Sequence, residues 1–307
     1  MWVSRRDLKQ RTGARIVETA AQAVFTVCAF AAVCAVGSIT LYMIANGIPA
    51  IWQIGVKEIL FSSLWRPAAS DPSFGILYII LSSVTATFLA VLLGVSVGVL
   101  TAVFLAEIAP EQLAAVIRPA VELLAGIPSV VYGLLGVMLL NPIMYRWERK
   151  LFQGSLSHQF TGGANLLSAV LVLAVMILPT VISISESALR AVPVQLKASS
   201  MALGASHIQT IFRVILPAAR PGIITAVVLG VGRALGEAMA VNMVSGGSVR
   251  LPLPFHSVRF LTTAIVSEMG YAEGLHRQVL FTIGMVLFLF IMLVNMLLHA
   301  ILKRGDG

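Results

Sequence analysis

Long apolar runs alternate with polar connectors along this chain, and six of the runs are long enough to cross a lipid bilayer as helices. A hydrocarbon core ~30 Å thick is spanned by about 20 helical residues. The expected spans are Ala20–Ala45, Pro72–Ala106, Val121–Leu140, Leu166–Ile184, Pro221–Val244 and Gln278–Leu302. The pattern predicts an all-α, polytopic membrane protein with six transmembrane helices.

The first two runs need separate comment because of their length. No charged residue occurs between Glu18 and Lys57, and this apolar core exceeds the ~7–15 residues of a cleavable signal peptide. We therefore expect an uncleaved membrane anchor. The second run, Pro72–Ala106, exceeds what a straight helix needs, so we expect it to tilt, bend or protrude.

The segment Gly94–Gly98 has the Gly-x-Ser-x-Gly pattern that places a nucleophilic serine on a strand-to-helix turn in some hydrolases. Here Ser96 falls inside a run predicted to be one helix, where small residues commonly allow helices to pack closely. We therefore disfavour an intramembrane hydrolase built on Ser96.

Composition supports the membrane prediction and indicates an orientation. The chain is 58% hydrophobic and 11% charged, whereas about one quarter of the residues in soluble domains are charged. The net charge of +8 does not indicate nucleic-acid binding, because the basic residues form no single patch with interleaved aromatic residues. In the six-span arrangement twelve lysines and arginines lie on the side of both termini and eight on the other side. The positive-inside bias therefore predicts cytoplasmic termini.

The sequence lacks the residue spacings that usually bind nucleotides or metals. No lysine follows the glycine-rich context of a phosphate-binding loop, and no zinc spacing occurs. Cys28 and Cys34 both lie in the first apolar run and form no disulfide framework. The energy that drives this protein must come from a partner or from an ion gradient.

The polar segment Pro193–Pro217, between the fourth and fifth spans, predicts two short helices joined at an elbow. Pro193 suits the first turn of a helix, and Gly204 suits the end of that helix because glycine readily takes a left-handed conformation. Ser206 and Gln209 have the capping-box spacing that begins a second helix. We expect Leu216 and Pro217 to end the second helix. The first helix carries small residues that would let a partner approach closely, and a helix resting on the lipid surface is an equally weighted alternative.

Two charged residues, Arg233 and Glu237, are expected near the middle of the fifth span. Arg233 follows Pro221 by twelve residues, about 18 Å along a helix. A charge at that depth costs at least ~2.5–3.5 kcal/mol, so it must face protein or water. The spacing of four places both side chains on one helix face, where they can pair. Gly232 and Gly236 have the spacing that allows close helix contact.

This charged pair has two interpretations. It could be a structural ion pair that locks two helices together. Alternatively, Arg233 lines an anion path and Glu237 holds the guanidinium until an oxyanion competes, because the planar guanidinium matches phosphate or sulfate oxygens. We favour the second interpretation, since an ionisable residue inside a membrane is a functional candidate. Glu122 and Glu186, near span ends, are expected to be structural.

The elbow resembles the cytoplasmic "EAA" coupling loop of ABC importer permeases, which carries a Glu-Ala-Ala triplet followed at fixed distances by Gly and Leu-Pro. The triplet here is Ala198-Ser199-Ser200, which lacks the acidic first member. The resemblance implies docking on a cytoplasmic ATPase through Lys197, Ala198, Ser199, Ser200, Gly204, Ala205, Leu216 and Pro217.

Three more stretches narrow the resemblance: LLAGIPSVVYG at Leu123–Gly133, GRALGEAMAV at Gly232–Val241 and SEMGYAEGLHRQVLF at Ser267–Phe281. With the elbow, they resemble the PstC-type permease subunit of bacterial phosphate ABC importers, within the type I ABC importer transmembrane family. The likeness covers Phe74 to the end of the chain. Ala238–Val241 favours this type over the sister PstA-type subunit.

The resemblance implies a permease subunit of an ATP-driven importer for inorganic phosphate in the bacterial cytoplasmic (inner) membrane. The implied partners are a PstA-type permease subunit, a dimer of PstB-type ATPases and a PstS-type phosphate-binding protein. The chain itself would be no enzyme and would bind no cofactor or metal, with ATP and Mg²⁺ held by the ATPase. Arg233 and Glu237 match the charged pair that the family associates with phosphate passage.

The expected division is a cytoplasmic basic tail (1–15), a first transmembrane helix with an external connector (16–73), a transmembrane core (74–302) with a coupling loop (190–220), and a cytoplasmic tail (303–307). The alternatives are the PstA-type sister subunit and a permease for sulfate or molybdate. A gradient-driven secondary transporter in which Glu237 carries a proton is disfavoured, because no internal repeat of that class is visible.

Overall fold

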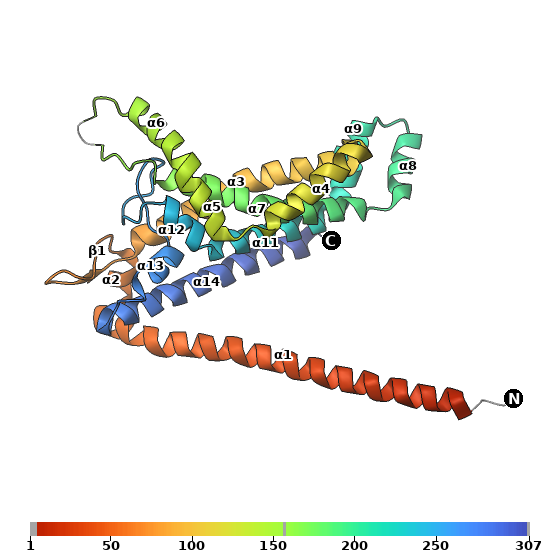
Figure 1. Ribbon diagram of the computed structural model, residues 1–307, viewed down its shortest axis with the longest axis horizontal. Helices are drawn as coiled ribbons and strands as arrows, with labels where there is room; N and C mark the ends of the chain where they lie inside the picture. Colours follow the sequence, from red (N-terminus) through yellow and green to blue (C-terminus); the bar gives the residue numbers. More distant parts are fainter. Residues whose placement is uncertain (1–4, 156–157, 306–307) are drawn as a thin grey trace.

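The computed structural model describes residues 5–155 and 158–305, which are almost entirely helical (Figure 1). The first four residues of the expected basic tail and the last two residues of the chain lie outside this description. The helical elements are α1 (Arg5–Ile54), α2 (Val56–Phe61), α3 (Leu77–Val103), η1 (Phe104–Ile108), α4 (Glu111–Gly126), α5 (Ser129–Leu135), η2 (Gly136–Leu140), α6 (Asn141–Leu151), α7 (Leu166–Arg190), α8 (Val194–Ala202), α9 (His207–Thr210), η3 (Ile211–Ile215), α10 (Leu216–Ala218), α11 (Arg220–Gly236), α12 (Met239–Val244), α13 (Leu261–Glu268) and α14 (Gly274–Gly305). The η elements are short π-helical turns.

The prediction of an all-α membrane protein is confirmed. Among the described residues, five helices are long and apolar enough to cross a membrane. A sixth span results if 207–218 and 220–236, which are bent by 67° against each other, are taken as one. The one small sheet is an antiparallel ribbon of β1 (Trp65–Arg66) and β2 (Ser73–Phe74) beside α2.

Helix α1 is longer than the expected first span and lies apart from the other helices over most of its length (Figure 1). Its 50 residues extend about 75 Å. Near the carboxyl end of α1, this helix packs on α14, and the Thr282 hydroxyl of α14 donates a hydrogen bond to the Gly47 carbonyl of α1 at 2.9 Å. The helix continues to Ile54, so part of the connector expected from Asn46 onwards is helical.

The core is formed where α3 and α11 pack on the two sides of α7. Gly94 and Gly98 of α3 lie against Ile177 and Val181 of α7 so closely that a methyl group at either glycine would overlap those side chains. The Ser96 hydroxyl donates to the carbonyl of Leu92 in its own helix at 2.7 Å. The glycines therefore serve helix packing, as the interpretation against a hydrolase required.

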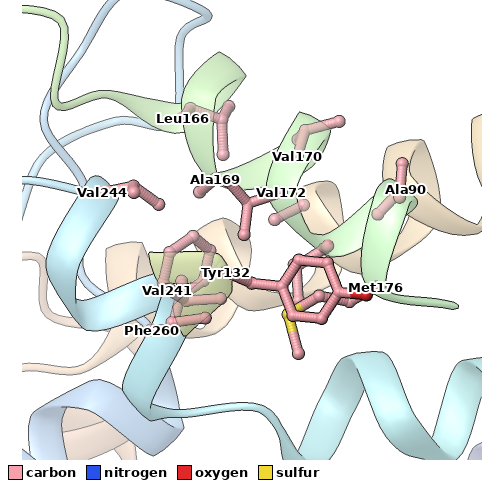
Figure 2. Packing of buried hydrophobic residues seen from close by; sticks show 14 of the residues in the cluster. Ala90, Tyr132, Leu166, Ala169, Val170, Val172, Met176, Val241, Val244 and Phe260 are labelled. Carbon is pink, nitrogen blue, oxygen red and sulfur yellow. The ribbon is translucent and has the colours of Figure 1, made fainter. Parts of the chain in front are cut away.

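Toward the amino end of α7 the core widens to include two short helices. Figure 2 shows Tyr132 of α5 and Val241 and Val244 of α12 beside Leu166 and Met176 of α7. Because α5 and α12 both pack on α7, the two broken segments that contain them are held in fixed positions.

Two expected spans are interrupted rather than continuous. The segment between the expected second and third spans is part of helix α4, which ends at Gly126 before the extended residues Ile127 and Pro128. The membrane-spanning helix then runs over 129–151 and includes all of α6, in place of the expected 121–140. The fifth span breaks at Glu237, whose backbone is extended between α11 and α12.

The remaining differences lie in the connectors. Helix α6 occupies the first part of the connector expected over 141–163, and α13 lies within the connector expected over 245–277. Helix α14 begins at Gly274, four residues before the expected sixth span. The amino end of α1 and the carboxyl end of α14 lie on the same side of Figure 1 as α8 and α9.

Candidate functional site

The elbow has the predicted geometry. Helix α8 begins after Pro193, and Gly204 takes a left-handed conformation with φ of 84°. Ser206 accepts a hydrogen bond from the Gln209 backbone N–H, and the Gln209 side chain accepts one from the Ser206 N–H, which completes the capping box. The second helix ends at Ala218, one residue after the predicted end.

Several contacts hold the elbow on the bundle. The Lys197 ammonium pairs with the Glu107 carboxylate at the end of η1, and His207 Nε2 lies 3.0 Å from the Glu107 carbonyl oxygen. The Ser200 hydroxyl lies 2.9 Å from that of Thr210, which ties α8 to α9. Thus Lys197 and Ser200, two of the expected docking residues, are engaged within the chain.

The outer face of the elbow has no covering element in the chain. Ala198 and Ser199 are exposed, as are Gly204 and Pro217, and Ala205 is half-buried. Leu203 is 90% exposed and Val194 is 74% exposed. An apolar face of this kind next to the bend is suited to a protein partner.

Arg233 lies on α11 near the centre of the bundle and is half-buried. Its Nη1 donates a hydrogen bond to the Thr180 hydroxyl of α7 at 3.3 Å. Within the described residues, no carboxylate lies in ion-pair distance of this guanidinium. The other N–H groups of the fork are therefore not committed to an acid.

The expected pairing of Arg233 with Glu237 is wrong, because α11 ends at Gly236 and the two residues do not share a helix face. The Glu237 carboxylate instead accepts the backbone N–H of Ala240 at 2.9 Å, at the beginning of α12. The Thr262 hydroxyl donates to the Glu237 carbonyl at 2.9 Å. These two hydrogen bonds satisfy backbone polar groups that the interruption of the helix would otherwise leave without a partner.

The expected close contact at Gly232 and Gly236 is also not formed in this chain. No atom lies within 4 Å of the position that a β-carbon would take at either glycine. Within the chain, this role falls to Gly94, Gly98 and Gly230, which face Ile177 or Val181 of α7.

A charged cluster that sequence analysis did not find joins α4 to α7. The buried Glu186 carboxylate accepts hydrogen bonds from Arg118 Nε at 2.7 Å and from Arg190 Nε at 2.9 Å. Arg118 also pairs with Glu111, and Arg190 donates to the Leu105 carbonyl at 3.3 Å. The hydrogen bond to Glu186, followed by that to Glu111, raises the pKa of Arg118. Glu186 therefore has a structural role. Its partner Arg190 is four residues away on the same helix, whereas its partner Arg118 was not predictable because it is 68 residues away.

Two further buried acids anchor the connectors on the opposite side. Glu148 accepts the Thr161 backbone N–H at 2.9 Å and pairs with His158, also at 2.9 Å. Glu268 pairs with Arg259 and with His276. These side chains bind one another and do not face an exposed path. They therefore fix the connectors in place.

Comparison with known proteins identifies the family of this fold. The family model described as "Binding-protein-dependent transport system inner membrane component" matches residues 94–305. The chain belongs to this family. It is a permease of an ABC importer and resembles the phosphate-type permeases of that class.

Several relatives align over most of the chain. A protein of Bacillus subtilis named "Probable ABC transporter permease protein YqgH" is 40% identical and covers 97% of this chain and 96% of its own. A "Phosphate transport system permease protein PstC" of Pasteurella multocida is 33% identical over 81% of each chain. The PstC of Xylella fastidiosa strain 9a5c is 34% identical and covers 88% of this chain and 86% of its own.

Solved structures support the type I ABC importer fold. An alginate ABC transporter in complex with its periplasmic protein has a chain with a TM-score of 0.58 at 16% identity, covering 88% of this chain and 94% of its own. An inward-facing MetNI methionine transporter has a chain with a TM-score of 0.57 at 21% identity, covering 75% of this chain and 95% of its own. At these identities the likeness concerns the fold alone.

Proposed function

We propose that this chain is the PstC-type subunit of an ATP-driven importer for inorganic phosphate and forms half of the translocation path. The observation that carries the proposal is the alignment of phosphate permeases at 33–34% identity over more than four fifths of the chain. The B. subtilis relative, whose name specifies no substrate, is compatible with this assignment.

The geometry of Arg233 supports an anion path. Its guanidinium is half-buried and hydrogen-bonded to Thr180, and no acid of residues 5–155 and 158–305 pairs with it. An oxyanion can therefore reach the fork without first displacing a carboxylate, and a planar guanidinium binds two oxygens of a phosphate at once. Glu237 lies at the break between α11 and α12. Its carboxylate holds the start of α12 and so positions the wall of the same path.

The elbow supports coupling in trans. We assign its exposed face, with Ala198, Ser199 and Gly204, to docking on a PstB-type ATPase that binds ATP and Mg²⁺. The amino end of α1 and the carboxyl end of α14 lie on the same side of Figure 1 as the elbow, so the proposed orientation places these helix ends in the cytoplasm of a bacterial cell. The opposite side, with the Glu148 and Glu268 clusters, would then face a PstS-type phosphate-binding protein, and a PstA-type subunit would complete the path.

The experiment below distinguishes this assignment from three alternatives. A PstA-type assignment and a sulfate or molybdate permease both keep the fold and the ATPase. A gradient-driven carrier that uses Glu237 for a proton is disfavoured by the family match and by the engagement of Glu237 at the start of α12.

The test is uptake of radiolabelled phosphate by cells that lack their own phosphate importer and express this chain with its neighbouring subunits. We expect uptake that stops when the ATPase subunit is omitted, and co-purification of that subunit with this chain. Uptake of labelled sulfate or molybdate with no uptake of phosphate would replace the proposed substrate.

A further inference from the structure

A polar cavity of about 360 Å³ lies between α4 and α7, near the elbow. It is lined by Leu105, Arg118, Val121, Glu122, Ile182, Ser183, Glu186, Ser187 and Arg190. Because one water takes about 30 Å³ in the liquid, the cavity has room for a small tetrahedral anion with several waters. It is separate from Arg233, which does not line it.

Most polar groups of this cavity are already engaged with one another. Glu186 binds both arginines, Arg190 also donates to Leu105, and the Ser187 hydroxyl donates to the Ser183 carbonyl at 2.8 Å. These contacts brace α4 and η1 against α7, and they need no ligand.

Three groups on the cavity wall stay without a protein partner in residues 5–155 and 158–305. Arg118 Nη2 is buried and makes no hydrogen bond. The Ser183 hydroxyl and the Glu122 carboxylate, which are both exposed, also make no hydrogen bond or ion pair in this part of the chain. A buried donor without a partner costs about 1–3 kcal/mol, more for a charged group, so this one calls for a ligand or water.

These three groups differ in what they can bind. Arg118 can only donate, Ser183 can donate or accept, and an ionised Glu122 can only accept. An anion that satisfies all three must accept from the arginine and the serine and also donate one hydrogen bond to the glutamate. Hydrogen phosphate has acceptor oxygens and a P–OH donor, whereas sulfate carries no proton at neutral pH.

We propose that this cavity is a second, inner anion site that binds protonated phosphate and rejects sulfate. Arg118 and Ser183 donate to phosphate oxygens, and Glu122 accepts the P–OH and repels an anion that lacks one. The inference rests on the proposed function, because it takes phosphate as the transported anion.

The place of the site along α7 fits a transit role. Ser183 follows Thr180, the partner of Arg233, by three residues, which is about 4.5 Å along the helix and on nearly the same face. An anion that leaves Arg233 toward the elbow therefore reaches Ser183 next. The wall carries two arginines and two glutamates, so its charges balance and the anion is not held tightly.

The test uses the purified importer with its partner subunits and without nucleotide. A Ser187→Cys reporter is placed in a chain whose Cys28 and Cys34 are changed to serine, and the rate of its labelling by a water-soluble thiol reagent is measured. Inorganic phosphate should slow labelling several-fold, and sulfate at the same ionic strength should not. A Ser199→Cys reporter on the elbow serves as the control and should respond to neither anion.

Two added substitutions assign the ligands without disturbing the bracing contacts. In Glu122→Gln the amide can donate, so sulfate should now protect the reporter as well. In Ser183→Ala the protection by phosphate should weaken several-fold. Equal protection by both anions in the parent, or protection by neither, would overturn the inner site. Phosphate uptake by the same preparation in vesicles separates the two proposals: uptake without protection rejects the inner site alone, and an absence of uptake rejects the proposed function.

Discussion

The Arg233 guanidinium donates a hydrogen bond to the Thr180 hydroxyl, with 3.3 Å between Nη1 and Oγ1, and joins α11 to α7 inside the bundle. A single neutral acceptor satisfies one of the five N–H donors of an arginine. The remaining donors make this residue the clearest position at which to test transport.

We expect Arg233→Met to assemble with its partners and to lose phosphate uptake by about 10- to 100-fold, the equivalent of one or two lost hydrogen bonds to a charged group. Arg233→Lys should also be impaired, because a point charge does not reproduce the planar fork. Arg250→Met, at an exposed connector position, is the matched control and should transport normally. Uptake and recovery of the complex are measured together, and normal uptake by Arg233→Met would reduce this residue to a packing role.

Glu237 should behave independently of Arg233, because its carboxylate caps Ala240 and does not pair with the guanidinium. Glu237→Gln keeps an acceptor and should be mild, whereas Glu237→Ala should destabilise the protein by about 0.5–2 kcal/mol, as other lost helix caps do. The thermal stabilities of Arg233→Met, Glu237→Ala and the double variant give a mutant cycle. Additivity within ~0.5 kcal/mol is expected for residues without contact. A larger coupling energy would show that the two side chains do form an ion pair.

The turn at Gly204 should tolerate only residues that accept a positive φ. Gly204→Val should cost about 1–3 kcal/mol of local strain and misplace α8, so that the chain inserts normally but no longer retains the ATPase. Gly204→Asn is the control, because asparagine enters the left-handed region more readily than other non-glycine residues. The measurement is ATPase recovered with the affinity-purified permease. Equal recovery with valine and glycine would show that the turn does not set docking.

Cysteine labels at Ser199 and at Gln153 should react from opposite sides of the membrane. Both positions are exposed, and α8, which contains Ser199, lies at the opposite end of Figure 1 from α6, which precedes Gln153. Gly163, in the same connector, is unsuitable for a label: its φ is 87°, and a β-carbon there would overlap the backbone of Asn141. Labelling of intact cells with an impermeant reagent, after removal of Cys28 and Cys34, gives the sidedness. Reaction of Ser199→Cys from outside would reverse the proposed orientation.

Removing the Glu268 carboxylate should destabilise the outer connectors. Glu268 is 4% exposed and binds Arg259, His276 and the indole N–H of Trp65. Breaking a buried pair on one side costs about 3–5 kcal/mol, because the remaining charge is left without a partner. The melting temperature of Glu268→Leu in detergent should fall well below that of the parent, while Glu273→Leu, at an exposed position on the same connector, should melt with the parent.

The parts of the structure that local residue chemistry determines were predictable. The bend at Gly204 and the capping box at Ser206 and Gln209 each depend on residues within a few positions of one another. The apolar runs fixed the number of crossings for a similar reason, since the bilayer sets a length that a single run must meet.

The parts that depend on distant residues were not predictable. Gly236 directly before Glu237 weakens the helix, but Ala234, Leu235, Ala238 and Met239 are good helix formers, so the local sequence alone did not decide that α11 ends there. The break is stabilised by the Thr262 hydroxyl, 25 residues further along the chain. The expected partnership with Arg233 was therefore wrong. The cluster at Glu186 depends in the same way on Arg118, whose distance in sequence conceals the contact.

The packing of α1 on α14 has a consequence for how the protein is made. The first long helix to leave the ribosome meets its neighbour only after the last one is synthesised, since Gly47 and Thr282 are separated by 235 residues. At 5–20 residues per second, that interval lasts about 10–50 s. During this time α1 is stable in lipid on its own, but the contact that fixes its place does not yet exist. A chain that stops before α14 would therefore leave most of α1 without a helix partner in the bilayer, because until then only its last turns pack, on Ile59 and Phe74. Completion of the last span ties the first span to the rest of the protein.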